Sequence, residues 1–406
     1  QYWWPVFEGV IYEADMSALE AKTSYVYRVG GFDTANNTAR LSKPFTFTSA
    51  PPTDQPDQRV TIGTLGDQGT FMFLGFATTE LLVQEQDKRA VDLVMIAGDL
   101  CYAGLSSDFP RHNITSDDEF EHVWDLWGIQ NEPVAATRPF MVGVGNHEKF
   151  YNFTSFNARY KMPSRRSGGE QNFWYSYDYG NVHWVSVSSE HSLREGSAQM
   201  DWIIRDLEAA AANRANIPWI VVSLHRPIYC SSFNSFKDTR PGGKYQVALE
   251  PLLLKYDVDL TLTGHMHCYE RIHPNVNGSV SVFPVNTSAT GTGVDTYYAT
   301  GHGPVHVVQG NTGAMQDTLW MHPKPKWSAV RFANGFVPSD DRLRDPASAT
   351  SIDIELELIS AVPPTAASGS SSASSSGGSS VEGLILSSNY TDTYGIGIAT
   401  FTNSTH

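Results

Sequence analysis

Cysteine, basic charge and long apolar runs are all scarce in this chain. Only three of its 406 residues are cysteines, so the fold is not a disulfide scaffold. Lys and Arg number 28 against 43 Asp and Glu, a formal net charge of −15, which argues against nucleic acid as a partner because phosphate backbones need a basic surface. No apolar run reaches the roughly 18 residues of a membrane span, so we expect no membrane partner. Any phosphate-bearing substrate must therefore be attracted by local cations such as metals.

Five short runs rich in β-branched residues each end in polar residues that can bind a metal. They read VTIGTLGD (60–67), DLVMIAGD (92–99), FMVGVGNH (140–147), WIVVSLH (219–225) and VDLTLTGHMH (258–267). Each is short enough for a buried strand. Ligands of open α/β sheets bind beyond the carboxyl ends of the strands, so we expect these polar residues to meet at one edge. They are Asp67, Asp99, Asn146, His225, His265 and His267.

Strand-like and helix-like segments alternate between residues 59 and 268. Helical spacing occurs at 78–90, 116–133 and 198–212, and Ser116 is suited to an N-terminal cap. Residues 171–189 predict a hairpin that turns at Tyr179-Gly180-Asn181. This alternation predicts an α/β fold with a mostly parallel central sheet, helices on both faces and some added antiparallel strands.

The regions that flank this core predict further parts. The segments EGVIYEADM, TSYVYRVGGF and RLSKPFTFTS, within residues 1–50, have the alternation of antiparallel strands. About 50 residues are too few for a β-sandwich of about 100, so we expect its front half to be missing. The remaining parts are a linker at 51–58, a main domain at 59–361, a Ser/Gly-rich flexible insertion at 362–381 and returning strands at 382–406.

The polar residues at the strand ends form a set that can hold two cations through mixed O and N donors. Asp99, in GDLCY, ends a buried strand, where a carboxylate needs a cation or hydrogen bonds for compensation. Tyr102 is either a phenolate ligand of the same ion or a packed aromatic. In GNHE, Asn146 offers its amide oxygen and His147 is placed to face the substrate, while Glu148 is a supporting hydrogen-bond acceptor or a solvated charge.

The fragment GHMH (264–267) carries the clearest signal. In an extended segment residues i and i+2 point the same way, which predicts that His265 and His267 lie side by side. His191 is a candidate for the rim of the pocket. The remaining histidines are expected to be structural or exposed: His112, His122, His183, His273, His302, His306 and His322.

Cysteines and sequons bear on the compartment. Cys101, Cys230 and Cys268 each lie within five residues of a proposed ligand, and Cys230 and Cys268 are either a bridge between two site loops or buried thiols. The chain begins at Gln1, which suggests a processed product or a fragment. An excess of N-x-S/T sequons predicts a secreted glycoprotein. They stand at Asn36, Asn113, Asn152, Asn277, Asn286, Asn389 and Asn403.

The blocks GDQG, GDLCY, GNHE, VVSLHRP and GHMH, over residues 59–310, resemble those of the purple acid phosphatases, members of the metallophosphoesterase superfamily. The resemblance implies a four-layer α/β sandwich with two mixed sheets flanked by helices. It implies Fe(III) held by Asp67, Tyr102 and His267, and a divalent Zn, Mn or Fe held by Asn146, His225 and His265, with Asp99 bridging both. Tyr102 separates this family from related protein phosphatases and nucleases.

Other segments are similar to the high-molecular-weight secreted members, and imply a secreted or vacuolar/lysosomal location. YVYRVG and FTFTSAP match the end of a fibronectin type III-like domain, which is then truncated here, and TYGIGIATFTNSTH is similar to the last catalytic strands, cut short at His406. The chain departs from the plant members after Cys230, where SSFNSFKD (231–238) has no histidine. Only His147 therefore carries over as a proton donor.

The expected activity is that of an acid phosphatase acting on small phosphomonoesters. A two-metal site clamps the phosphate and activates water, and a trivalent iron keeps hydroxide available in acid. We expect in-line attack by metal-bound hydroxide, with His147 stabilising the equatorial oxygens or protonating the leaving group. A phytase-like or phosphodiesterase activity is the alternative, and a non-catalytic secreted binding protein is a third interpretation.

Overall fold

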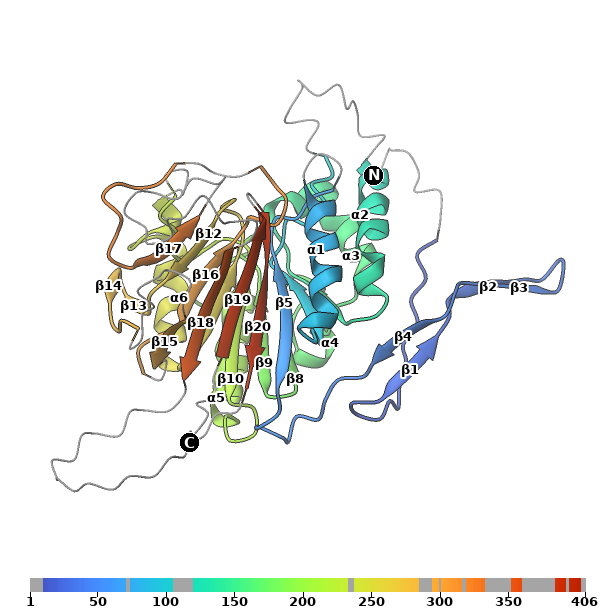
Figure 1. Cartoon of the computed structure of the whole chain (residues 1–406), viewed down its shortest axis with the longest axis horizontal. Coiled ribbons are helices and arrows are strands. Elements are labelled where there is room, and N and C mark those ends of the chain that lie inside the picture. The colour runs from blue at the N-terminus through green and yellow to red at the C-terminus, as the bar shows by residue number, and fades with distance from the viewer. Residues whose placement is uncertain are drawn as a thin grey trace.

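The computed structural model describes residues 10–70, 74–104, 120–232, 237–284, 294–298, 301–315, 319–332, 352–359, 384–391 and 394–402. Two seven-stranded sheets form the centre of this part of the chain (Figure 1). In spatial order, the first contains β15 (Val294–Tyr298), β18 (Ile352–Ile359), β19 (Leu384–Thr391), β20 (Tyr394–Phe401), β5 (Val60–Leu65), β6 (Leu93–Ile96) and β7 (Phe140–Val142). The second contains β17 (Ser328–Phe332), β12 (Tyr269–Ile272), β16 (Val305–Gln309), β11 (Leu260–Thr263), β10 (Trp219–Leu224), β9 (Val182–Val187) and β8 (Tyr175–Tyr179).

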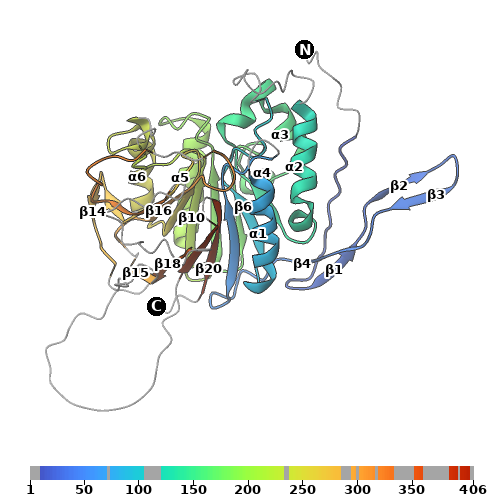
Figure 2. The ribbon, with the colours of Figure 1, turned by 45° about the horizontal axis from the view of Figure 1, so that its top comes forward.

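Helices cover the outer faces of both sheets. Figure 2 shows α1 (Gly75–Lys88) and α2 (Phe120–Ala135) on one side of the strands, with α5 (Ala198–Ala212) and α6 (Lys244–Lys255) on the other. Shorter helices complete the connections: η4 (Asn146–Phe153), α3 (Thr154–Arg159), α4 (Ser164–Ser167) and η5 (Lys237–Thr239). The four-layer α/β sandwich is confirmed, whereas the single central sheet expected from the strand pattern is wrong. Strand alternation does not encode which of two sheets a strand joins.

Strand directions decide where the loops gather. β5, β6 and β7 are mutually parallel, as are β9, β10, β11 and β16. Antiparallel strands lie beside them, since β20 pairs with β5, β12 with β16 and β8 with β9. The carboxyl ends of the parallel strands therefore point to a common edge within each sheet.

Successive residues of the central strands face two different apolar layers. On β5, Val60 and Ile62 face the layer between the sheets, while Leu65 packs in the layer beneath the helices. On β10, Trp219 and Val221 face the inner layer and Ile220 the outer one. This period of two, with every position buried, explains why these strands are almost continuously hydrophobic.

Most predicted elements are found, with shifted ends. α5 spans the predicted 198–212, and the predicted hairpin turns at Gly180, whose φ is +58° between paired Tyr179 and Val182. α1 begins at Gly75 rather than 78. α2 begins at Phe120, so the predicted cap Ser116 lies outside the described residues. The Ser/Gly tract at 362–381 lies outside them too.

A separate ribbon precedes the sandwich and projects from it (Figures 1 and 2). β1 (Ser24–Tyr27) pairs with β4 (Phe45–Thr48), and β2 (Gly30–Asp33) pairs with β3 (Thr38–Leu41). The strand expected for EGVIYEADM is wrong over residues 10–16, which pair with no described strand and leave Tyr12 88% exposed. Alternation alone cannot form a strand where no neighbour supplies hydrogen bonds. A short hairpin, β13 (Asn275–Val276) with β14 (Ser279–Val280), completes the strands.

No helix among the described residues combines the length and the apolar character that crossing a membrane requires.

Candidate metal centre

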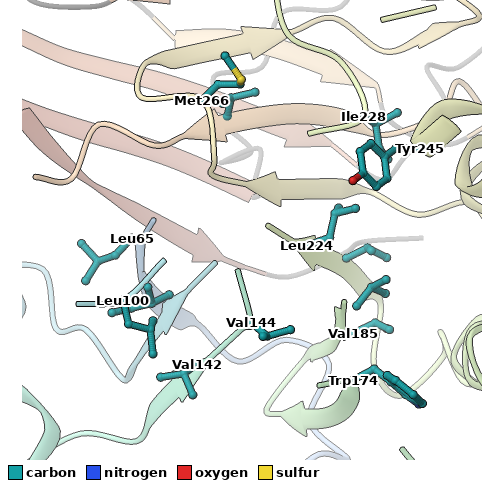
Figure 3. Close-up of a cluster of buried hydrophobic side chains, with 14 of the residues drawn as sticks. Leu65, Leu100, Val142, Val144, Trp174, Val185, Leu224, Ile228, Tyr245 and Met266 are labelled. Carbon is teal, nitrogen blue, oxygen red and sulfur yellow. The ribbon is translucent and has the colours of Figure 1, made fainter. Parts of the chain in front are cut away.

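The candidate ligands follow the carboxyl ends of strands in both sheets. Asp67, Asp99 and Asn146 follow β5, β6 and β7 of the first sheet, and His225 and His265 follow β10 and β11 of the second. Buried apolar neighbours anchor these loops. Figure 3 shows Leu65 of β5 and Leu224 of β10, together with Leu100, Val144 and Met266 from the loops that follow β6, β7 and β11. The packing of the two sheets thus brings residues nearly 200 positions apart to one edge, where the backbone amide of His265 donates to Asp67 Oδ2 over 2.7 Å.

One group of side chains consists of Asp67, Tyr102 and His267. The Tyr102 hydroxyl lies 3.1 Å from Asp67 Oδ1 and 3.0 Å from His267 Nε2, and these last two atoms lie 3.4 Å apart. His267 Nδ1 lies 2.7 Å from the carbonyl oxygen of Met315, so it is the N–H donor and Nε2 keeps its lone pair toward the group. A phenol, a carboxylate and an imidazole thus converge on one point.

A second group consists of Asp99, Asn146, His225 and His265. His225 Nε2 lies 3.1 Å from Asp99 Oδ2 and 3.2 Å from Asn146 Oδ1, while its Nδ1 donates to the carbonyl of Ala97 over 2.9 Å. Donor atoms of Asp99, His225 and His265 all lie within 4.8 Å of one another. The Nδ1 bond fixes the tautomer that leaves Nε2 available as a ligand.

His265 and His267 do not lie side by side as the sequence predicted. The loop at Gly264–Cys268 is bent rather than extended, with φ of +67° at His265. The His265 ring packs against His225, with ring centroids 5.0 Å apart, whereas His267 contacts Tyr102. The bend therefore sends one histidine to each group.

Glu148 links the loop of Asp99 to the loop of Gly145 through hydrogen bonds. Its Oε2 accepts from the backbone amides of Asp99 at 2.9 Å and Gly145 at 2.7 Å, and its Oε1 accepts from Leu100 at 2.9 Å. The side chain is 2% exposed, so Glu148 is the supporting acceptor and not a solvated charge. Burial and the nearby Asp99 carboxylate raise its pKa to about 8. A cation beside Asp99 would relieve this repulsion.

The same loops contain strained backbone positions. Four candidate ligands occupy the left-handed region, with φ of +59°, +50°, +58° and +67° at Asp67, Asp99, Tyr102 and His265. Such conformations in residues with a Cβ cost of order 1 kcal/mol or more each and cluster at functional sites. The neighbouring Gly145 is required for another reason, since a Cβ there would lie 2.2 Å from Asp99 Oδ1.

The charges of the second group call for a cation. Burial opposes ionisation of Asp99, but the imidazoles of His225 and His147 outweigh burial and lower its pKa. Burial likewise lowers the pKa of His225, but the carboxylates of Asp99 and Asp67 outweigh it and raise this pKa to about 10. A positive charge is therefore favoured between these buried carboxylates. The oxygen and nitrogen donors fit a metal ion that takes over this role.

Burial and the Asp67 carboxylate raise the pKa of Tyr102 well above its usual range. A phenolate at this position therefore needs strong compensation, which a bound cation would supply.

His147 lies beside both groups without joining either. Its backbone amide donates to Asp99 Oδ1 over 2.8 Å, and its Nε2 lies 3.9 Å from Asp99 Oδ2. Its ring packs on Tyr102 with centroids 4.6 Å apart, and its buried Nδ1 has no hydrogen-bond partner among the described residues. The side chain is 20% exposed, and a partly exposed histidine at the edge of a metal centre can exchange a proton with a substrate.

Arg226 and Glu190, which the sequence patterns did not predict, complete the edge. Arg226 directly follows His225 in HRP, and its guanidinium is paired with Glu190 and lies 3.0 Å from His265 Nε2. The sequence signal that could have indicated Arg226 is its position directly after a candidate ligand.

His191, the predicted rim residue, packs among Phe153, Phe173 and Trp174, and Ser188 Oγ lies 2.8 Å from its Nδ1.

Cys230 and Cys268 are both buried beneath the site loops. Their Sγ atoms lie 4.0 Å apart, too far for a disulfide bond, so the structure has the buried thiols rather than the bridge. Cys101 is buried as well.

The other histidines lie away from the two groups. His183 is paired with Asp178 and Asp206, His306 is buried against Thr261, and His273 contacts Tyr297. The side chains of His122 and His302 form no hydrogen bond or ion pair with another described side chain, and His112 lies outside the described residues.

The predicted sequons fall into three groups. Asn36, Asn152 and Asn277 are exposed, and Asn389 is on β19. Asn113, Asn286 and Asn403 lie outside the described residues.

A two-sheet sandwich with two donor groups at its strand ends is an arrangement suited to holding metal ions. The model of the calcineurin-like phosphoesterases matches residues 64–269, about half of the chain and all of the candidate ligands. The chain belongs to this family, in the branch that contains the purple acid phosphatases.

Individual relatives agree with this placement. Purple acid phosphatase 18 of Arabidopsis thaliana is 31% identical over 80% of this chain and 64% of its own length, and human acid phosphatase type 7 is 36% identical over 62% and 55%. The structure of the purple acid phosphatase PPD1 from yellow lupin superposes with a TM-score of 0.65 at 21% identity, over 95% of this chain and 61% of that one, which shows the shared fold. The chain thus spans less than two thirds of each of these relatives.

Proposed function

We propose that this protein is a binuclear-metal acid phosphatase that hydrolyses small phosphomonoesters. The observation that carries the proposal is the convergence of two donor groups at one edge, one around Tyr102 and one around His225. The relatives' printed names, purple acid phosphatase and acid phosphatase, agree with this activity.

We assign Fe(III) to Asp67, Tyr102 and His267, and a divalent Zn, Mn or Fe to Asn146, His225 and His265. Asp99 is assigned as the residue shared by both. A buried carboxylate with a phenol favours a hard trivalent ion, and two imidazoles with an amide oxygen favour a borderline divalent ion. When bound, the two metals supply a Lewis-acid clamp for phosphate oxygens and an acidified water.

The residues of the chain supply orientation and proton transfer. Glu148 holds the backbone of Asp99 and Gly145, and the Nδ1 bond of His225 to Ala97 fixes its ring. His147 faces the phosphoryl group and donates a proton to the leaving-group oxygen, a role supported by its partly exposed side chain beside Asp99 and Tyr102.

The remaining assignments concern the surroundings of the catalytic region. We propose a secreted or vacuolar/lysosomal glycoprotein, supported by the exposure of Asn36, Asn152 and Asn277. We also propose a catalytic domain that begins at residue 59 and recruits its last strands from 382–406, supported by the pairing of β20 with β5. The ribbon within residues 1–50 is proposed as part of a fibronectin type III-like domain.

Metal analysis and spectroscopy of the purified protein test this proposal. We expect two metals per chain, one of them iron, a visible tyrosinate band, and hydrolysis of p-nitrophenyl phosphate at pH 4 to 6. Tyr102→Phe should lose the band, and Asp99→Ala should lose turnover by a factor of about 10² or more. The exposed Asp54→Ala is the matched control that should retain turnover, band and metals. Full turnover in Asp99→Ala would overturn the assignment.

A further inference from the structure

The guanidinium of Arg226 is held at the edge of the metal centre by an acidic partner. Its Nε donates to Glu190 Oε1 over 2.7 Å, and its Nη2 donates to Glu190 Oε2 over 3.2 Å. This two-point pairing fixes the plane of the guanidinium as well as its position. The side chains are 24% and 13% exposed, so the pair lies partly buried beside the site.

A single hydroxyl ties the two partners together. Ser189 Oγ accepts from the backbone amide of Arg226 over 3.0 Å and donates to Glu190 Oε1 over 2.9 Å. Glu190 comes from the loop after β9, whereas Arg226 follows His225 at the end of β10. The arrangement is therefore set by the neighbouring positions of two parallel strands.

The third nitrogen of Arg226 is aimed at the candidate ligands and not at Glu190. Nη1 lies 3.0 Å from His265 Nε2, its one hydrogen-bonding contact among the described residues. An ion pair that served only to stabilise the loop would be complete with Glu190. Here a guanidinium nitrogen with two N–H groups lies within hydrogen-bonding distance of a proposed ligand of the divalent metal.

The acidic surroundings of the site indicate a role for Nη1 of Arg226. A phosphomonoester must approach a protein of net charge −15 at an edge lined by Asp67, Asp99 and Glu190. The segment after Cys230 carries no histidine at 231–238 to meet it. A guanidinium keeps its charge at every pH in question and hydrogen-bonds phosphate oxygens in a defined plane.

We propose that Arg226 binds the phosphoryl group of the substrate, with Nη1 donating to a non-bridging oxygen and Glu190 holding the guanidinium in place. This deepens, and rests on, the phosphatase function proposed above. Arg226 is then a substrate-binding residue, and Glu190 acts through it as a positioning residue.

Inorganic phosphate and p-nitrophenyl phosphate are the probes. In the metal-loaded chain with excess iron and zinc, Arg226→Ala should weaken competitive inhibition by inorganic phosphate and raise KM by a factor on the order of 10 to 100, the usual loss for a hydrogen bond to a charged group. Arg226→Lys should recover part of this affinity, because it keeps the charge but loses the planar pairing. Glu190→Gln should show a smaller loss than Arg226→Ala.

Bound metal, measured by elemental analysis, and phosphate affinity, measured by calorimetry, separate the outcomes. Unchanged metal content with weakened phosphate binding supports the proposal. The proposal would be overturned if phosphate inhibition and KM of Arg226→Ala stayed within twofold of the parent values. It would also be overturned if both Arg226→Ala and Arg226→Lys lost metal even in excess metal, because that would show that Arg226 only orients His265. Arg194 is an exposed arginine in the loop that carries Glu190, and Arg194→Ala is the control that should change neither metal content nor phosphate affinity. A parent chain with neither metal nor hydrolysis would instead overturn the phosphatase function itself.

Discussion

At the residue scale, the site depends on backbone positions that side chains seldom occupy. Asp67, Asp99, Tyr102 and His265 all have positive φ, and each lies in a loop that follows a strand. The strain is compensated by hydrogen bonds such as that of His265 N to Asp67 and those of Glu148 to three backbone amides. These hydrogen bonds hold the loops that carry the candidate ligands in place.

Gly145→Ala tests how closely the loops approach one another. The new Cβ would lie 2.2 Å from Asp99 Oδ1 and 2.5 Å from its backbone nitrogen, so one loop must shift. We expect a loss of unfolding free energy of about 1–3 kcal/mol from overpacking, together with weaker metal binding. Chemical denaturation and metal titration measure the two effects.

Gly128→Ala is the matched control, because Gly128 lies exposed on α2 and its Cβ would meet nothing within 4 Å. This variant should gain about 0.5–1 kcal/mol from helix propensity and bind metal normally. Equal behaviour of the two variants would show that the loops are not tightly packed at Gly145.

At the element scale, ion pairs far from the metals join secondary structures. His183 on β9 lies between Asp178 of β8, at 2.6 Å, and Asp206 of α5, at 3.1 Å. Burial lowers the pKa of His183, but hydrogen bonds to the two carboxylates outweigh burial and raise the pKa to about 9. The protonated imidazole thereby ties the edge hairpin of the second sheet to the helix that covers it.

The stability of the protein should fall between neutral and alkaline pH because of this residue. With a folded pKa near 9 and an ordinary value of 6.5, the contribution of His183 is complete below pH 6.5 and is lost as the pH rises through 9. It amounts to about 2–4 kcal/mol. In the parent, the unfolding free energy should be lower near pH 10 than near pH 6. In His183→Gln this difference should be smaller by about 2–4 kcal/mol. An identical pH dependence in the two proteins would refute the ion-pair assignment.

At the scale of the whole molecule, the layer between the sheets determines whether the two donor groups meet. Ile62 of β5 is fully buried in that layer, opposite residues of the second sheet. Ile62→Ala should cost about 2–5 kcal/mol of unfolding free energy through lost burial and a cavity. Ile129→Ala, at a position of α2 that is 67% exposed, should change stability by less than about 0.5 kcal/mol.

Thermal and denaturant unfolding of both isoleucine variants compare them directly. Equal costs at the two positions would contradict the assignment of Ile62 to the inter-sheet layer. A large cost at Ile62 alone, accompanied by weaker metal binding, would show that sheet packing holds the candidate ligands in register.

The sequence by itself determined which residue types stand at the strand ends, and from them we predicted the candidate ligands. Strands and their polar ends are local patterns, so Asp67, Asp99, Asn146 and His225 could be assigned to strand ends, and α5 and the hairpin at Gly180 could be placed within a residue or two. The supporting role of Glu148 was one of two open alternatives, because burial is not a local property.

Only the tertiary structure decided how these residues are distributed. The division of the strands between two sheets, the separation of His265 from His267 and the pairing of Arg226 with Glu190 all depend on segments that are distant in the chain. Such contacts leave no periodicity in the sequence, since they are selected by the packing of layers against one another. The residue types of the candidate site therefore follow from local sequence, whereas their geometry follows from the packing of the whole sandwich.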